Sequence, residues 1–184
     1  SILAYTIDHA EVQLIFVAEE CRELINLAIK DKKNEINTVL LDPITGPDLN
    51  AIPKADNKLS IEDKSPASND VALLMYTSGT TGKPKGVMLT HANLLAAGRF
   101  ISTGHEINEK DKGLCVLPIY HINGLCVTVM GTIASASTLI IPNKFSVNSF
   151  WKIISDFRCS WFSAVPTQFS YILNNEEIPD DISS

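Results

Sequence analysis

The sequence has no excess of positive charge. Its 184 residues include 15 lysines and arginines against 21 aspartates and glutamates, a formal net charge of −6. Nucleic acids and anionic lipid surfaces bind clusters of Lys and Arg, so a general role on either is excluded. Any phosphate binding must therefore be local. Hydrophobic residues make up 45% of the chain and charged residues 20%, which is typical of a folded globular protein.

Closely spaced cysteine pairs are also absent. The four cysteines are Cys21, Cys115, Cys126 and Cys159, and none forms a CxxC motif. The sequence contains no spacing of His, Cys and Asp that predicts a structural metal site, and no nucleophile triad. We predict that the cysteines are reduced core residues of a cytoplasmic protein, because residues 1–10 lack the basic and apolar regions of a secretory signal.

Charged residues are missing from 113–143, and a charge-free run of this length can indicate a membrane span. Five residues divide this run: Pro118, His121, Asn123, Gly124 and Pro142. The unbroken apolar pieces are shorter than the roughly 20 residues that a spanning helix needs. We therefore expect no transmembrane segment.

Short apolar runs alternate with helical patterns along most of the chain. Residues 1–41 predict a strand, a helix and a strand. Residues 42–69 hold four of the nine prolines and show no period, which predicts an irregular connection. Residues 70–184 resume the alternation, and Thr90 is a predicted N-cap for the helix that follows it. The pattern predicts an α/β fold with a largely parallel sheet flanked by helices, in which 71–76 is a strand covered on both faces.

The polar stretch "YTSGTTGKPKG" (76–86) directly follows this predicted strand. It combines three kinds of group, which come from the glycines Gly79, Gly82 and Gly86, the hydroxyl residues Thr77, Ser78, Thr80 and Thr81, and the lysines Lys83 and Lys85. Backbone amides without a Cβ, hydroxyls and cations together suit a phosphate-binding loop. On composition alone, a solvated Gly/Ser/Thr turn explains the stretch equally well.

The spacing differs from that of the common P-loop. Only Thr80 and Thr81 separate Gly79 from Gly82, and Pro84 follows Lys83. An apolar, strand-like run comes next, so we expect no helix dipole at the phosphate. The amides, hydroxyls and lysines would have to bind it.

The longer stretch "YTSGTTGKPKGVMLTH" resembles the phosphate-loop signature of adenylate-forming enzymes, the superfamily of acyl-CoA synthetases, amino-acid-activating adenylation domains and luciferases. A second stretch, "LPIYHINGL" (117–125), resembles the "LPxxHxxG" segment that lines the acyl and adenylate pocket of acyl-CoA synthetases. The tripeptide "VPT" (165–167) also falls at the family's position. The resemblance extends over nearly the whole chain.

This resemblance implies a role for each matching residue. The residues that would bind the β- and γ-phosphates of ATP are Thr77, Ser78, Gly79, Thr80, Thr81, Gly82, Lys83, Lys85 and Gly86. Thr80 would also contact the magnesium ion of the nucleotide. In this family a carboxylate attacks the α-phosphorus of MgATP to form an acyl-adenylate and pyrophosphate, and coenzyme A then displaces AMP. The implied substrates are a fatty or aryl acid, ATP and CoA.

His121 allows two interpretations. A lone histidine in an apolar run is often a hydrogen-bonded structural residue. The resemblance places it instead near the reacting carboxylate, as the candidate catalytic residue, with Gly124 leaving room beside it. Among the other histidines, we predict His91 in the first turn of a helix, and His9 and His105 at the surface.

Several motifs of the family have no counterpart here, including its adenine site, its ribose-binding acidic residue and its C-terminal lysine. We therefore expect this chain to be a middle part of the large N-terminal domain and to be inactive alone. One alternative is an amino-acid-activating domain, although Ile119, Tyr120, His121 and Ile122 provide no acidic partner for an amine. A non-catalytic nucleotide-binding module is the other.

Overall fold

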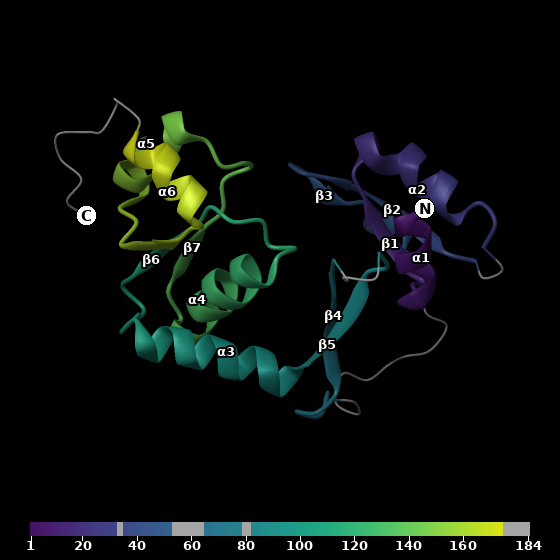
Figure 1. Ribbon diagram of the computed structural model, residues 1–184, viewed down its shortest axis with the longest axis horizontal. Helices are drawn as coiled ribbons and strands as arrows, with labels where there is room; N and C mark the ends of the chain where they lie inside the picture. The colour runs from purple at the N-terminus through teal and green to yellow at the C-terminus, as the bar shows by residue number, and fades with distance from the viewer. Residues whose placement is uncertain (33–34, 53–64, 79–81, 175–184) are drawn as a thin grey trace. The chain divides into compact units, whose positions relative to one another are not determined.

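The computed structural model describes residues 1–32, 35–52, 65–78 and 82–174 (Figure 1). These residues form two compact units. Unit 1 contains 1–66 and 76–88, and unit 2 contains 67–75 and the chain from Leu89 onward. Within the described ranges, no helix has the length and apolar character that crossing a bilayer requires.

Unit 1 is built around a small sheet in the order β1-β2-β3. The strands β1 (Leu14–Val17) and β2 (Asn37–Asp42) are parallel, and β3 (Gly46–Pro47) is antiparallel to β2. The helices are α1 (Ile2–His9) and α2 (Arg22–Ile29), with short 3₁₀ turns η1 (Glu19–Cys21) and η2 (Leu49–Ala51). The predicted strand, helix and strand over 12–41 are confirmed. The helix α1 was not predicted.

Unit 2 has a parallel sheet in the order β7-β6-β8. Its strands are β6 (Lys112–Cys115), β7 (Thr138–Ile140) and β8 (Trp161–Ser163). The helices are α3 (His91–Gly104), the π-helix η4 (Asn123–Val129), α4 (Met130–Ser135), α5 (Val147–Phe157) and α6 (Pro166–Leu173). This parallel arrangement confirms the predicted α/β class.

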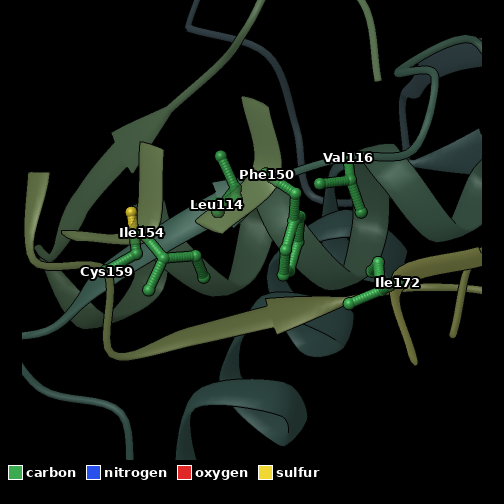
Figure 2. Packing of buried hydrophobic residues seen from close by; sticks show 6 residues of the cluster. All are labelled: Leu114, Val116, Phe150, Ile154, Cys159 and Ile172. Carbon is green, nitrogen blue, oxygen red and sulfur yellow. The ribbon is translucent and has the colours of Figure 1, made fainter. Parts of the chain in front are cut away.

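Strand alternation divides unit 2 into three layers. On one face of the sheet, Leu114 and Val116 pack against Phe150 and Ile154 of α5 and against Ile172 of α6 (Figure 2). On the other face, the ring of Trp161 lies against Gly113 and near Gly131 of α4. A Cβ on Gly113 would stand 2.7 Å from that ring, so glycine is required for this contact. The first face holds the main core, with Phe150 only 1% exposed.

The helix α3 begins as the sequence predicted, with His91 in its first turn. The Oγ1 of Thr90 accepts a hydrogen bond from the Asn93 amide at 3.1 Å, and Asn93 Oδ1 accepts one from the Thr90 amide at 3.0 Å. This reciprocal pair satisfies two amides at the helix start, and it fixes where the strand before Thr90 ends.

The prediction for the strand at 71–76 was wrong in one respect. The strands β4 (Val71–Thr77) and β5 (Lys85–Thr90) pair with each other as a two-stranded sheet. Among the described residues no helix covers β4 on both faces, and Val71 is 53% exposed. A connection of seven residues between the strands is too short for a parallel crossover, which explains why the apolar run joins a hairpin.

The prediction for the cysteines needs one correction. Cys115 and Cys159 are buried and Cys126 is half-buried, but Cys21 is exposed rather than in the core. All four cysteines are free thiols. In the helix α5, the last residue Phe157 is exposed, and the helix ends there at the left-handed residue Arg158.

Arg158 offers a stability prediction. It ends α5 with φ 53°, a conformation in which its Cβ is crowded and which glycine adopts freely. We expect Arg158→Gly to raise the free energy of unfolding by about 0.5 to 1 kcal/mol, measured by urea denaturation. Ser155→Gly, inside the same helix, should lower it instead. A loss of stability in Arg158→Gly would contradict this interpretation of the helix end.

Candidate functional site

The polar loop joins β4 to β5 in unit 1. Thr77 ends β4, Ser78 follows it, and Gly82, Lys83 and Pro84 lead into β5 at Lys85. The predicted nucleotide-binding residues Gly79, Thr80 and Thr81, including the predicted magnesium contact, lie outside the described residues. The remaining predicted members are Thr77, Ser78, Gly82, Lys83, Lys85 and Gly86, and the structure brings them together on the two arms of this hairpin.

The described part of the loop is open to solvent and carries uncompensated positive charge. Thr77, Ser78, Gly82, Lys83 and Lys85 are exposed, and Gly86 is half-buried. Within the described residues, neither lysine ammonium has a carboxylate partner. A polyphosphate could therefore accept hydrogen bonds from both lysines without breaking an existing ion pair. The lysine ammonium groups of this loop are therefore chemically suited to bind the phosphates of a nucleoside triphosphate.

Gly82 has a conformational reason to be glycine. Its φ is 81°, in the left-handed region, and a Cβ built on it would meet nothing within 4 Å. The requirement is therefore the backbone dihedral rather than space. This bend turns the chain from the loop into Lys83 and β5.

Two side chains of α1 contact the ends of the loop. The Nδ1 atom of His9 lies 2.7 Å from the hydroxyl oxygen of Tyr76, the residue before Thr77. The Nζ atom of Lys83 lies 5.6 Å from the ring centroid of Tyr5. Desolvation, and to a lesser extent Tyr5, raises the pKa of the Tyr76 phenol above its ordinary value. Sequence reasoning placed His9 at the surface, where it does lie, but missed this contact.

The segment around His121 lies in unit 2, after the carboxyl end of β6. The His121 amide donates to the carbonyl of Pro118 at 3.0 Å, and the Leu125 amide donates to the carbonyl of His121 at 3.1 Å. The His121 side chain is exposed, with its ring 4.8 Å from that of Tyr120. The turn from strand to helix therefore presents this imidazole to solvent.

Gly124 determines how tightly this turn closes. A Cβ at this position would stand 2.4 Å from the Pro118 carbonyl oxygen and 2.9 Å from that of Leu117. Asn123, the first residue of η4, accepts a hydrogen bond from Ser163 Oγ at the end of β8, at 3.1 Å. A π-helix is rare and often found at functional sites. Gly124 thus makes room for the backbone of this segment, whereas we had expected it to leave room beside His121.

A cavity of about 450 Å³ lies beside this segment, at the carboxyl ends of β6 and β7. It is lined by residues 115–120 and 141–145 and by Gln168, without His121. Gln168 Nε2 donates to the Val116 carbonyl at 3.0 Å, and its Oε1 accepts from the Val165 amide at 3.2 Å. Sequence reasoning did not predict Gln168, although the neighbouring tripeptide at 165–167 was the available signal.

The cysteine in this cavity, Cys115, is poorly suited to act as a nucleophile. Burial raises the pKa of the Cys115 thiol, which donates to the Leu117 carbonyl at 3.3 Å. A protonated thiol is a poor nucleophile and a poor metal ligand. In the part of the chain that the structure describes, no group of three His, Cys, Asp or Glu residues could bind a metal ion.

Comparison with known proteins finds one family over nearly the whole chain. The profile of a family described as "AMP-binding enzyme" matches residues 2–184. The sulfoacetate–CoA ligase of Cupriavidus necator is 35% identical over 175 residues, which cover 94% of this chain and 34% of the relative. The oxalate–CoA ligase of Arabidopsis thaliana is 32% identical over 152 residues, or 80% of this chain and 29% of the relative.

A solved structure shares the fold. The ATP-bound crystal structure of MatB from Rhodopseudomonas palustris superposes with a TM-score of 0.78 at 26% identity, covering 96% of this chain and 34% of that one. The chain therefore spans about a third of the length of the relatives it matches. Its α/β fold corresponds to part of their N-terminal domain.

Proposed function

The chain belongs to the AMP-binding enzyme family, and from this premise we propose that the protein containing it is an ATP-dependent acid–thiol ligase that converts a carboxylic acid into its coenzyme A thioester. The relatives at 32% and 35% identity are CoA ligases by name. The main support for the proposal is the exposed hairpin loop, in which neither Lys83 nor Lys85 pairs with a carboxylate of the described residues, so that both suit the triphosphate of ATP.

Two steps make up the proposed reaction. A carboxylate oxygen of the acid attacks the α-phosphorus of MgATP, and the bond from that phosphorus to the bridging oxygen of the β-phosphate breaks. The products are the acyl-adenylate and pyrophosphate. The sulfur of the coenzyme A thiolate then attacks the acyl carbon, and AMP leaves with the electron pair of the broken C–O bond. Charge accumulates on the pyrophosphate in the first step, where cations and amides stabilise it.

The described residues would have distinct roles in this reaction. Lys83 and Lys85 would neutralise the pyrophosphate, while Thr77 and Ser78 donate hydroxyl hydrogen bonds and Gly82 and Gly86 allow close approach of the backbone. Gly79, Thr80 and Thr81 complete the proposed set, with Thr80 close to the magnesium ion. His121 would stand near the acid's carboxylate, as the candidate catalytic residue of unit 2.

The substrate would be an acid rather than an amino acid. The cavity beside the His121 segment has no Asp or Glu among its lining residues, and Lys144 is the charged side chain there. A buried or half-buried ammonium needs a carboxylate partner, which this lining does not supply. Fatty, aryl and short dicarboxylic acids are the classes to compare.

The proposal is tested by ATP–pyrophosphate exchange in the full-length protein. We expect exchange that depends on a carboxylic acid, followed by thioester formation on addition of coenzyme A. Exchange driven by amino acids would instead favour the adenylation-domain alternative. ATP binding without exchange for any acid or amino acid would overturn the enzyme proposal and leave the nucleotide-binding module.

A further inference from the structure

The helix α1 is held in place within unit 1 by contacts with residues outside the loop. Ile7 is buried, with 5% of its surface exposed. Lys32, which follows α2, donates to the Ala4 carbonyl at 2.8 Å and pairs with the Asp8 carboxylate at 2.9 Å. The Lys32 side chain is only 17% exposed, so this pairing is better shielded than an ordinary surface ion pair. The helix can therefore serve as a fixed support.

Tyr5 and His9 form a second, aromatic side of α1. A spacing of four residues places them on one helix face, and their ring centroids are 5.4 Å apart. His9 also meets Tyr76 ring to ring, with centroids 5.7 Å apart at 79°. The two residues thus present a continuous aromatic and imidazole surface.

This surface contacts the polar loop at both of its ends. At the start, the 2.7 Å contact joins His9 Nδ1 to the hydroxyl of Tyr76, directly before Thr77. At the other end, the ammonium of Lys83 lies 5.6 Å from the centroid of the Tyr5 ring, directly after Gly82. A phenol hydroxyl can donate and accept, so which of the two atoms donates depends on the tautomer of the His9 ring.

We propose that α1 positions the phosphate loop for ATP, with His9 holding the loop's start through Tyr76 and Tyr5 holding the ammonium of Lys83 at its end. This inference rests on the proposed nucleotide-binding function of the loop. Neither α1 residue touches the nucleotide itself; both are positioning residues. Fixing a lysine side chain costs about 2 kcal/mol of rotamer entropy, and a ring that orders Lys83 beforehand reduces what ATP binding has to supply.

The His9 contact is tested by measuring ATP affinity in the full-length protein. We expect His9→Ala to raise the Kd for ATP about three- to tenfold, the value of one lost hydrogen bond. The KM for the acid and kcat at saturating ATP should stay near those of the unchanged protein. His9→Asn places an acceptor oxygen and a donor nitrogen at the same number of bonds from Cβ as Nδ1. Its amide can therefore meet the Tyr76 hydroxyl in either direction, and it should restore most of the affinity.

Two further variants isolate the hydrogen bond itself. Tyr76→Phe removes only the hydroxyl and should weaken ATP binding as much as His9→Ala does. The double variant should be no weaker than either single one, because both remove the same contact. His105→Ala replaces an exposed histidine of unit 2 and should leave the Kd for ATP unchanged.

The Tyr5 contact has its own matched pair. Tyr5→Phe keeps the ring face and should preserve ATP affinity, whereas Tyr5→Leu removes it and should raise the Kd about two- to fivefold. Equal affinity in Tyr5→Leu and Tyr5→Phe would overturn the role of the ring. Thermal unfolding of each variant separates a local effect from a general loss of stability.

The outcomes distinguish this inference from the proposed function. Acid-dependent exchange in the unchanged protein, together with an unaltered Kd for ATP in His9→Ala, would overturn the positioning role and leave the function intact. A lower ATP affinity in His9→Ala that His9→Asn restores would support positioning even if no acid drives exchange. A fall in melting temperature in His9→Ala without a change in Kd would show that the contact is structural only.

Discussion

Replacing Lys85 with alanine in the full-length protein should lower the rate of acid-dependent ATP–pyrophosphate exchange about a hundredfold, the cost of removing one group that stabilises developing negative charge. Lys85 is exposed at the first residue of β5, and among the described residues no carboxylate neutralises it. Its ammonium is therefore available to the leaving pyrophosphate. The measurement is the initial exchange rate at saturating ATP and acid.

Folding should be nearly unaffected by this change, since an exposed side chain without a partner contributes less than about 0.5 kcal/mol to stability. Lys30→Ala is the matched control, because Lys30 is an exposed lysine of the same unit placed after α2. We expect normal exchange from Lys30→Ala and partial recovery from Lys85→Arg, which keeps the charge. An exchange rate in Lys85→Ala equal to that of the unchanged protein would contradict the role assigned to the loop.

The order of strands and helices could be predicted because it depends on local signals. Periodic apolar residues located α2, α3, α5 and the parallel strands, and Thr90 marked the start of α3 through its capping geometry. The helix α1 gave no such signal, since only Ile7 of its eight residues is buried. An apolar run such as β4 indicates that a strand is buried, but it does not indicate which strand pairs with it. The connection after β4 is too short for a parallel crossover, so β4 pairs with β5.

The candidate site was predictable only where a single stretch of sequence contains it. The composition of 76–86 suited a phosphate loop and a solvated turn equally well, and the order of its residues, which resembles the signature of adenylate-forming enzymes, favoured the phosphate loop. The contacts of this loop with Tyr5 and His9 join residues that are far apart in the sequence. His9 and Tyr76 are 67 positions apart, and no local pattern encodes such a pairing. The same holds for Gln168, whose amide bonds to Val116 across 52 residues.

Gly124→Ala should have the largest effect on the segment that carries His121. The added Cβ would stand 2.4 Å from the Pro118 carbonyl oxygen, and the obstructing atom belongs to the backbone, which cannot rotate away as a side chain can. Overpacking of this kind costs about 1 to 3 kcal/mol. We expect unfolding at a lower urea concentration and, in the full-length protein, a KM for the acid that rises more than the KM for ATP.

The predicted split between the two KM values follows from where the strain acts. Residues 117–121 would have to move to admit the methyl group, and residues 117–120 line the cavity at the carboxyl end of β6, whereas the lysine-bearing loop belongs to the other unit. Gly104→Ala is the control, because a Cβ there meets nothing within 4 Å and alanine favours a helix. If Gly124→Ala unfolds at the same urea concentration as Gly104→Ala and its KM for the acid is unchanged, the close turn at Pro118 has no part in binding the acid.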